Sequence, residues 1–442
     1  MTVAVSDTLI VDNLPVDSQG MDVAQLSQIL KQATGVVASR GEGVLLYDED
    51  DRRYLDFTAG MGVTSTGHCH PRVVEAAQRQ VGTLIHGQYT TVLHRPLLTL
   101  VERLGDVLPP GLDRMFFANS GSEATEAALR LSRQATGRPN IIVFHGGFHG
   151  RTVAAGSLTT SGTKFRSGFG PLMAGVHVSP FPDPGHFGWP TEQATEFALA
   201  QLDYILQTLS APADTAAFFV EPVLGEGGYV PANQRFLEGL RERADAHGML
   251  LVLDGADGFR PHGQVLGPRP FQRALQRPPR HPDHREGTGV GLPTFGHRGA
   301  VGADEKAWPG SQGGTYGANA VACAAALATL DVIRDEHLVD NSAERGAQLK
   351  QALQTVADKH DQITDVRGLG LMIGNEFRFA DGKPDGVTAA AVQQEAARRG
   401  LLLLTCGAWS QVVRFIPALV VSAEEIEEAA DIWADAVSAV VS

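Results

Sequence analysis

Residues 117–128 read Phe-Ala-Asn-Ser-Gly-Ser-Glu-Ala-Thr-Glu-Ala-Ala, and this stretch decides the fold. An apolar run leads into a Ser-Gly-Ser turn, and an alanine-rich helix with acids in its first turn is predicted directly after it. Gly121 and Ser122 then place free backbone N–H groups and a hydroxyl at the positive end of a helix, which suits a phosphate group. A Ser-x-x-Glu capping box explains the same letters, so the pattern alone leaves both interpretations open.

The same alternation of strand and helix extends over most of the chain. Apolar runs that end in polar residues occur at 115–119, 141–145, 216–221 and 249–254, and amphipathic stretches separate them. This pattern is typical of a mostly parallel sheet with helices on both faces. Two short strands are expected within 41–57. After about residue 320 an alanine-rich helix leads into a smaller unit, with strands in 365–377 and 412–421 and a closing helix at 423–440.

Composition favours small-molecule chemistry. The chain has 442 residues, 43% hydrophobic and 19% charged, which fits an enzyme-sized globular protein of two or three packed units. A formal charge of -14 disfavours nucleic-acid binding, which needs a basic surface. The three cysteines lie far apart, so we expect neither a disulfide framework nor a metal cluster. No apolar run reaches membrane-spanning length and the first residues are acidic, so we expect a cytoplasmic protein without membrane contact.

Three more polar clusters follow predicted strands. Phe148 and Arg151 lie in a glycine-rich stretch after the second strand, Glu221 and Glu226 follow the third, and Asp254 ends the fourth. An aromatic ring can stack on a flat ligand, and a guanidinium can bind a carboxylate through two hydrogen bonds. Each cluster alone has an ordinary structural explanation. Because the carboxyl ends of parallel strands form the ligand-binding edge of open α/β sheets, the four clusters together predict a site.

At this point the chain resembles a known family, the class III or ω-amino acid aminotransferases, which use pyridoxal phosphate. The resemblance covers about 35–255 and 299 to the C-terminus. It rests on the Asp48-Glu-Asp-Asp-Arg-Arg-Tyr-Leu-Asp-Phe57 stretch, Gly67-His-Cys-His-Pro71, the Asn-Ser-Gly-Ser-Glu-Ala run at Asn119, Phe148-His-Gly-Arg-Thr152, the Glu-Pro-Val run at Glu221, Gly313-Gly-Thr-Tyr-Gly317 and Arg414-Phe-Ile-Pro417.

The resemblance implies the fold of aspartate aminotransferase, fold type I of the pyridoxal-phosphate-dependent transferases. This is an α/β fold with a mostly parallel central sheet and a smaller α+β domain. It divides the chain into a leader with part of the small domain (1–65), a large cofactor-binding domain (66–320) and a C-terminal small domain (321–442).

The resemblance also gives the polar clusters roles in binding the cofactor. Ser120, Gly121 and Ser122 hold its phosphate, and Thr315 reaches the phosphate from the partner subunit, which implies a homodimer or a dimer-based oligomer. Phe148 stacks on the pyridine ring with His149 beside it. Asp254 pairs with the pyridinium nitrogen, which keeps the ring an electron sink.

The remaining residues are implied to bind substrates, a small amino donor and 2-oxoglutarate. Arg151 binds one substrate carboxylate, and Glu221 belongs to the same group. Arg414 takes the α-carboxylate of 2-oxoglutarate, while Glu226 pairs with it when an ω-amine of the 4-aminobutyrate type is bound. Leu224 stands where the family often has glutamine, which puts contacts with the ring hydroxyl in doubt.

One residue required by the family is absent, a lysine that holds the cofactor as a Schiff base. It belongs after the Asp254 strand, but the chain has lysines only at 31, 164, 306, 350, 359 and 383. Lys306 is nearest in sequence and is predicted to lie on the surface. The expected region, 255–298, contains seven arginines, seven prolines and no lysine, with little periodicity. We therefore expect it to form no ordinary elements, to pack poorly and to be sensitive to proteases.

A shifted reading frame explains this block. If each codon is read one base later, with free choice of wobble bases, 279–298 can become Pro-Asp-Ile-Leu-Ile-Thr-Ala-Lys-Gly-Leu-Ala-Ser-Gly-Phe-Pro-Leu-Ser-Gly-Ile-Ala, the family's lysine segment. The same offset turns 255–271 into the family's continuation after the strand, whereas 273–278 do not resolve. The lysine codon then spans Glu286 and Gly287.

Several functions stay open at this stage. The gene can encode an aminotransferase whose translation contains a frameshift, through a sequencing error or a real lesion. The chain as it stands can instead be a non-catalytic homologue. An acetylornithine or ornithine aminotransferase, or an amino acid racemase of the same family, shares much of this framework.

Overall fold

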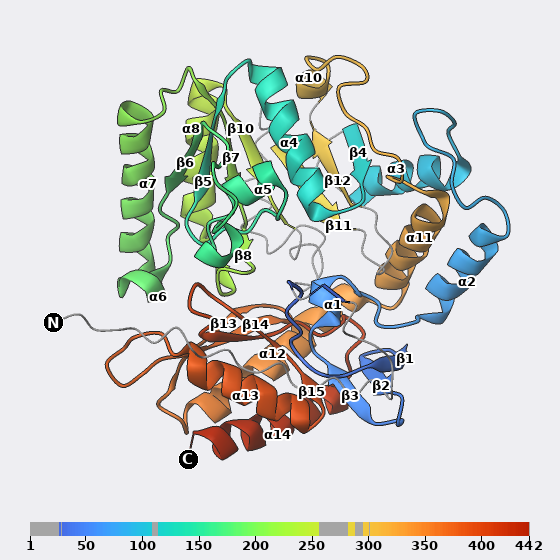
Figure 1. Cartoon of the computed structure of the whole chain (residues 1–442), viewed down its shortest axis with the longest axis vertical. Coiled ribbons are helices and arrows are strands. Elements are labelled where there is room, and N and C mark those ends of the chain that lie inside the picture. Colours follow the sequence, from blue (N-terminus) through green and yellow to red (C-terminus); the bar gives the residue numbers. More distant parts are fainter. Residues whose placement is uncertain are drawn as a thin grey trace.

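The computed structural model describes residues 26–27, 29–107, 114–255, 282–287, 295–299 and 301–441, with the backbone alone for 282–287, 295–299 and 301–302. Figure 1 shows two units, a larger one built around a central sheet and a smaller one that combines the first strands of the chain with its last helices.

The larger unit is built on a seven-stranded sheet in the order β4-β12-β11-β10-β7-β5-β6. Only β12 runs antiparallel to its neighbours β11 and β4, so the other strands share one direction. The strands are β4 (Arg114–Ala118), β5 (Asn140–Phe144), β6 (Val176–Ser179), β7 (Thr215–Val220), β10 (Leu250–Leu253), β11 (Pro282–Gly287) and β12 (Phe295–Gly299).

Helices cover both faces of this sheet because alternate strand residues point to opposite sides. One face of β5, β7 and β10 packs with α7 (Thr191–Thr208) and α8 (Gln234–His247), through pairs such as Phe144 and Phe236. The other face packs with α4 (Gly121–Thr136) and α5 (Val153–Leu158), where Val143 and Phe219 meet Leu129 and Leu158.

The smaller unit joins the two ends of the described chain. Its first sheet has the order β1-β2-β3-β15, in which Leu55 pairs with Leu401, and its second has the order β13-β14-β17-β16. Trp433 lies fully buried in the shared core. The elements are β1 (Ala38–Glu42), β2 (Leu45–Asp48), β3 (Arg53–Asp56), α12 (Leu338–Ala357), β13 (Ile363–Leu369), β14 (Met372–Phe377), α13 (Gly386–Arg398), β15 (Leu401–Leu402), β16 (Leu404–Cys406), β17 (Val412–Phe415) and α14 (Ala423–Val440).

The remaining elements connect the two units. Helix α11 packs against α2 and α3 beside the sheet, as Figure 1 shows. These connecting elements are α1 (Ala59–Gly62), α2 (Pro71–Val81), α3 (Arg95–Val107), the 3₁₀ turn Thr163–Phe165, α6 (Pro184–Phe187), the hairpin of β8 (Val223–Leu224) and β9 (Val230–Pro231), α10 (Val301–Asp304) and α11 (Ala320–Asp335). Within the described residues, no helix has the length and apolar character needed to cross a membrane.

Most predicted elements are confirmed. The four apolar runs form β4, β5, β7 and β10, and the closing helix spans 423–440 as expected. The 365–377 segment is a hairpin of β13 and β14, and the 41–57 segment contains three strands where two were expected. The 412–421 strand ends early at Phe415, two residues before Pro417, which cannot donate a ladder hydrogen bond. The domain boundaries stay a prediction.

The expectation for the anomalous block is wrong in two places. Residues 282–287 and 295–299 form β11 and β12 inside the central sheet, between β10 and β4. Backbone hydrogen bonds to the neighbouring strands can hold such segments whatever their side chains, which explains why strands form where the composition predicts none. The rest of the block, 256–281 and 288–294, lies outside the described residues, as does the expected leader at 1–20.

Candidate functional site

The four polar clusters lie at one edge of the central sheet. Ser120 to Ser122 follow β4, Phe148 to Arg151 follow β5, Glu221 follows β7 and Asp254 follows β10. These four strands run in the same direction, so their carboxyl ends form one edge. The prediction that separate sequence clusters meet at this edge agrees with the contacts described below.

The start of α4 contains half of the expected capping box, because Glu123 accepts the backbone N–H of Asn119 and not that of Ser120, and the phosphate interpretation stays a prediction. Ser120 is the N-cap, and its Oγ accepts the N–H of Glu123 at 3.2 Å. Ser122 Oγ accepts the backbone N–H of Arg151 at 3.1 Å, which ties the helix start to the loop after β5. Gly121 begins the helix between them, and no acceptor among the described residues takes its N–H or that of Ser122, so the positive end of the helix lies at the sheet edge.

Gly150 allows this contact. Its φ is +126°, and a Cβ built on it lies 2.4 Å from Ser122 Oγ, so no larger residue fits without a shift. On the other side of the loop, Glu221 accepts the backbone N–H groups of Phe148 at 2.7 Å and Gly225 at 3.1 Å. Both oxygens of Glu221 therefore help to hold the Phe148 loop, and its expected role in substrate binding stays a prediction.

Asp254 and His149 form the buried centre of the site. Nδ1 of His149 lies 2.8 Å from Oδ2 of Asp254, and the two side chains are 1% and 2% exposed. The backbone carbonyl of His149 accepts the Thr125 hydroxyl at 2.7 Å, and its ring meets Phe219 edge to face. The resemblance placed His149 beside the cofactor ring but did not pair it with Asp254, which lies 105 positions away in the sequence. A buried carboxylate held in one orientation can accept a hydrogen bond from a cationic ring nitrogen.

Arg414 and Glu226 meet across the boundary between the two units. Arg414 lies on β17 of the smaller unit, and Glu226 lies in the hairpin of β8 and β9. Nη2 of Arg414 is 2.6 Å from Oε1 of Glu226, with side chains 7% and 14% exposed. The N–H of Gly407 also donates to the backbone carbonyl of Glu226 at 2.8 Å.

Met61 is a site residue that sequence analysis missed. Its Sδ lies 3.9 Å from Nη2 of Arg414, and its side chain is 51% exposed. Ala59, Gly60, Met61 and Gly62 all have positive φ, which is unusual for a non-glycine residue and concentrates at functional sites. In the sequence, the glycines on both sides of Met61 were the signal that could have indicated this unusual backbone conformation.

Arg151 and Lys164 flank one aromatic ring beside the site. The guanidinium carbon of Arg151 lies 5.1 Å and Nζ of Lys164 lies 4.8 Å from the centre of the Phe165 ring. Phe165 packs edge to face on Phe148, with ring centres 5.0 Å apart. Lys164 was not selected from the sequence, although it lies over the ring that packs on Phe148.

Thr315 is the expected site residue that the structure does not bring into the cluster. Its side chain is exposed, and its loop lies against the end of β4, where a Cβ on Gly317 would meet the carbonyl oxygen of Phe117 at 2.4 Å. An exposed position agrees with a role in another subunit but does not test it. Leu224 packs in the core, 3% exposed, so it offers no polar contact to a ligand.

The site fits the non-covalent contacts of pyridoxal phosphate. The start of α4 with the close approach of Gly150 suits a phosphate, the half-buried Phe148 ring suits a flat ring, and the buried Asp254 suits a protonated ring nitrogen. The covalent contact does not fit. All six lysines of the chain are described and exposed, and none lies between β10 and α10, where the family's lysine is expected.

The backbone register locates the position where that lysine is expected. Leu253 of β10 pairs with His284 of β11, and Asp254 comes directly after Leu253. Position 286 is therefore two residues beyond the paired His284, near the carboxyl end of β11, beside the strand that Asp254 ends. The codon argument assigned the lysine to the same position.

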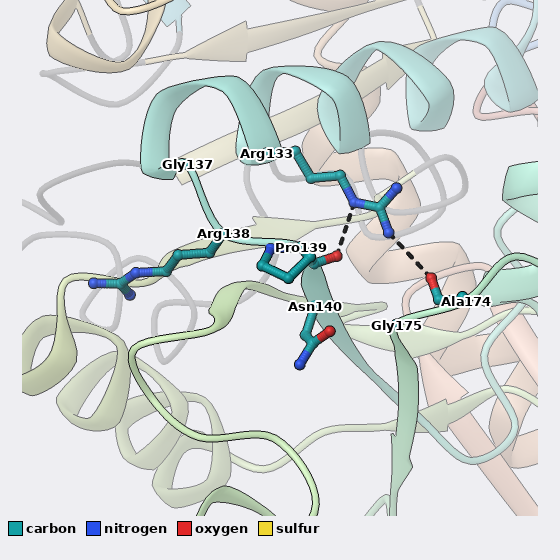
Figure 2. A pocket seen from close by; sticks show the side chains of 7 residues that line it. All are labelled: Arg133, Gly137, Arg138, Pro139, Asn140, Ala174 and Gly175. Atoms are coloured by element: carbon teal, nitrogen blue, oxygen red, sulfur yellow. Dashed lines mark hydrogen bonds between the residues drawn. The ribbon is translucent and has the colours of Figure 1, made fainter.

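A separate pocket of about 540 Å³ lies at the opposite edge, where β5 begins. Figure 2 shows that Arg133 donates to the carbonyl oxygens of Pro139 and Ala174. Arg138 donates to the carbonyl oxygens of Thr215 and Gly248. Both guanidiniums thus tie loops together, which is a structural role.

Comparison with known proteins extends these observations. The pattern of the family described as aminotransferase class III matches residues 28–264 and 288–437. The 4-aminobutyrate aminotransferase of Escherichia coli is 33% identical over 420 residues, covering 92% of this chain and 95% of that protein. An acetylornithine aminotransferase of Archaeoglobus fulgidus is 35% identical, covering 90% and 94%. An alanine/serine racemase of Pyrococcus horikoshii is 32% identical, covering 90% and 84%.

Solved structures agree. An amine transaminase from an uncultivated Pseudomonas species, solved in its pyridoxal-phosphate-bound form, has a TM-score of 0.82 and 28% identity and covers 92% of this chain and 94% of that chain. The fold expected from the sequence, fold type I of the pyridoxal-phosphate-dependent transferases, is confirmed, and so is pyridoxal phosphate as the cofactor of the family. The chain belongs to the class III aminotransferases.

Proposed function

We propose that the protein in its original reading frame moves an amino group from an ω-amino acid of the 4-aminobutyrate type to 2-oxoglutarate. The observation that carries this proposal is the ion pair between Glu226 and Arg414. Because Glu226 already supplies a negative charge to Arg414, an amine donor that lacks an α-carboxylate can bind without leaving this guanidinium unpaired. When 2-oxoglutarate binds, its α-carboxylate takes the place of Glu226 on Arg414, because both offer the same two-oxygen acceptor. The similarity to a 4-aminobutyrate aminotransferase supports this choice of donor.

The other substrate contact belongs to Arg151. No ion pair involves its guanidinium within the described residues, and it lies over Phe165, beside Phe148. A distal carboxylate of either substrate can bind there. Lys164, on the same ring, adds a second positive charge to this side of the site.

The cofactor is held by the residues at the sheet edge. Ser120, Gly121 and Ser122 bind its phosphate together with Thr315 of the partner subunit, Phe148 stacks on its ring, and Asp254, oriented by His149, binds the ring nitrogen. When bound, the ring supplies an electron sink for a substrate carbanion.

A second copy of the chain completes this site. Large apolar side chains that are 38% to 65% exposed lie on the segment after α2 and on the segment around Thr315: Leu84, Ile85, Val92, Leu93, Trp308 and Tyr316. The two segments adjoin, because the rings of His86 and Tyr316 are 5.4 Å apart. Such a patch is typical of a subunit interface. Light scattering should show a dimer that Ile85→Asp dissociates and Val387→Asp, an equally exposed change on α13, does not; a monomeric parent protein would overturn this assignment.

The chain as its sequence stands lacks the covalent link, and we propose that its turnover is near background. A frameshift over about 255–298 explains the loss. Two observations support it: the family match leaves out 265–287, and position 286 lies near the carboxyl end of β11, next to the strand that Asp254 ends. A chain that exists in this form is instead a non-catalytic homologue that holds the cofactor through phosphate contacts and Asp254.

Resequencing codons 250–300 separates these two accounts. The proteins with and without the restored frame should then be loaded with pyridoxal phosphate, reduced with borohydride and mapped by peptide mass. We expect a pyridoxyl-lysine at position 286 of the frame-restored protein and none in the chain as it stands. High occupancy on Lys164, whose Nζ lies over the Phe165 ring that packs on Phe148, or on Lys306 would show that another lysine serves and would overturn the account of the lost function.

The relatives leave two other reactions to test in the same frame-restored protein. An acetylornithine aminotransferase consumes N-acetylornithine faster than 4-aminobutyrate, and a racemase interconverts L- and D-alanine without any 2-oxo acid. Faster turnover of N-acetylornithine than of 4-aminobutyrate, or racemisation of alanine without a 2-oxo acid, would replace our assignment.

A further inference from the structure

A second cavity, of about 570 Å³, lies behind the candidate site. It is bounded by the loops after β5 and before α6 in the larger unit, and by β13, β14 and the loop 407–411 in the smaller one. Its volume is within the range of roughly 300–1,000 Å³ typical of small-molecule pockets. None of the residues that the sequence selected for cofactor or substrate lines it. His145 precedes the Phe148 loop and Gly227 follows Glu226, so the two sites share walls but not ligand-facing side chains.

One wall of this cavity is flat and aromatic. The rings of His186 and Trp409 stack, with centres 6.4 Å apart and planes inclined by 19°. Trp409 is 56% exposed, and Phe187 lies beside His186 with ring centres 5.1 Å apart. An exposed, already stacked pair of rings can take a third flat ring at little entropic cost.

The acidic groups of the cavity already have partners. Glu376, 4% exposed, is held between Arg367 and Arg378, with Oε1 at 2.6 Å from Nη2 of Arg378 and Oε2 bonded to Arg367. Oδ1 of Asp183 accepts the backbone N–H of His186 at 3.1 Å. The fixed charges of the lining, two arginines and two carboxylates, cancel.

Several donors in the lining have no partner among the described residues. Ser161 is 2% exposed, and its buried hydroxyl makes no hydrogen bond. Gln411 uses its Oε1 to accept the N–H of Trp409, which leaves the two N–H groups of its amide without a described acceptor. The ring nitrogens of His145 have no described partner either. Partial burial and the nearby His186 lower the pKa of His145, so near pH 7 its ring is neutral and offers one N–H.

We propose that this cavity binds a small organic carboxylate carried on a flat apolar ring. The carboxylate accepts hydrogen bonds from Ser161, Gln411 and His145, and the ring stacks on Trp409. A buried hydroxyl and amide without acceptors cost free energy that such a ligand recovers. Since the fixed charges cancel, the lining suits one negative charge better than the two of a phosphate ester. The proposal does not depend on the aminotransferase reaction.

Calorimetric titration of the full chain with benzoate tests the ligand class. Benzamide, which has the same shape without the charge, should bind about tenfold more weakly, because hydrogen bonds to a charged acceptor are the stronger ones. Cyclohexanecarboxylate, which cannot stack, should bind about fivefold more weakly. Phenyl phosphate that binds more tightly than benzoate, or the absence of saturable benzoate binding, would overturn the proposal.

Variants locate the bound molecule. Trp409→Ala should weaken benzoate about fivefold, whereas Tyr204→Ala, which removes a comparably exposed aromatic ring from α7, should change nothing. Ser161→Ala should weaken it too, and Arg414→Ala should leave it intact. Loss in Arg414→Ala with retention in Trp409→Ala would place benzoate in the candidate active site and overturn the assignment. Should the Ser161 variant fail to fold, an anomalous peak from soaked 4-bromobenzoate decides the location, and a peak outside the cavity refutes the proposal.

Discussion

Arg414 and Glu226 form an ion pair with 2.6 Å between Nη2 and Oε1, although one lies on a strand of the smaller unit and the other in a hairpin of the larger unit. Both side chains are largely buried, so neither charge can be left alone without a cost of several kcal/mol. The pair therefore couples the position of the smaller unit to the state of the site. When a substrate carboxylate replaces Glu226 on Arg414, the displaced Glu226 carboxylate must bind another partner or be hydrated.

Arg414→Ala should separate the two half-reactions of the frame-restored enzyme. The half-reaction with 2-oxoglutarate loses the guanidinium that binds its α-carboxylate and should slow by about 100-fold, within the 2–5 kcal/mol typical of a truncated charge pair. The half-reaction with 4-aminobutyrate should change much less. Single-turnover kinetics measures both, and Arg398→Ala, on an exposed ion pair, is the control. Equal losses in the two half-reactions would count against the exchange role of Arg414.

Gly150→Ala should destabilise the site loop more than an ordinary glycine substitution does. Gly168 also has positive φ, +81°, but a Cβ on it meets nothing within 4 Å, so Gly168→Ala costs only backbone strain, about 1–2 kcal/mol. At Gly150 the overlap with Ser122 adds about 1–3 kcal/mol. Denaturant unfolding of the two variants measures the difference. Equal losses in the free energy of unfolding of the two variants would show that Ser122 moves aside without cost.

The cysteines should differ in reactivity with pH. Burial raises the pKa of Cys323 and Cys406 to about 12, whereas Cys69 is exposed. A pKa raised by folding means that the neutral thiol is favoured in the folded state. This stabilisation is complete below the unfolded pKa, about 8.5, and is lost as the pH rises through about 12. Iodoacetamide at pH 8 should therefore label Cys69 alone until the protein unfolds. Rapid labelling of Cys406 in the folded protein, located by peptide mass, would contradict this.

Trypsin should cut first between residues 256 and 281. This stretch contains several arginines and prolines and, from its sequence, no apolar face to bury. Mass spectrometry of early fragments locates the cuts, and the frame-restored protein, in which the segment reads as apolar strand and wall, is the control. Early cleavage at the same place in both proteins would show that the reading frame has no effect on packing there.

The sequence by itself determined the fold class and the residue types of the site. Continuous apolar runs that end in polar residues predicted β4, β5, β7 and β10, because a parallel strand buried on both faces is apolar along its whole length. The Ser-Gly-Ser turn likewise predicted the start of α4, since capping is local. The absence of the Schiff-base lysine also followed from the sequence alone.

Tertiary structure alone decided which side chains meet. The contacts of His149 with Asp254 and of Met61 with Arg414 form only when segments far apart in the sequence pack together. Tertiary structure also brought Glu221 against the Phe148 loop, where its oxygens accept backbone N–H groups. Strand β11 formed despite an unsuitable composition, since its backbone pairs with β10. Local patterns fix local conformation, whereas contacts between residues far apart in sequence depend on the geometry of the whole sheet, which no short stretch contains.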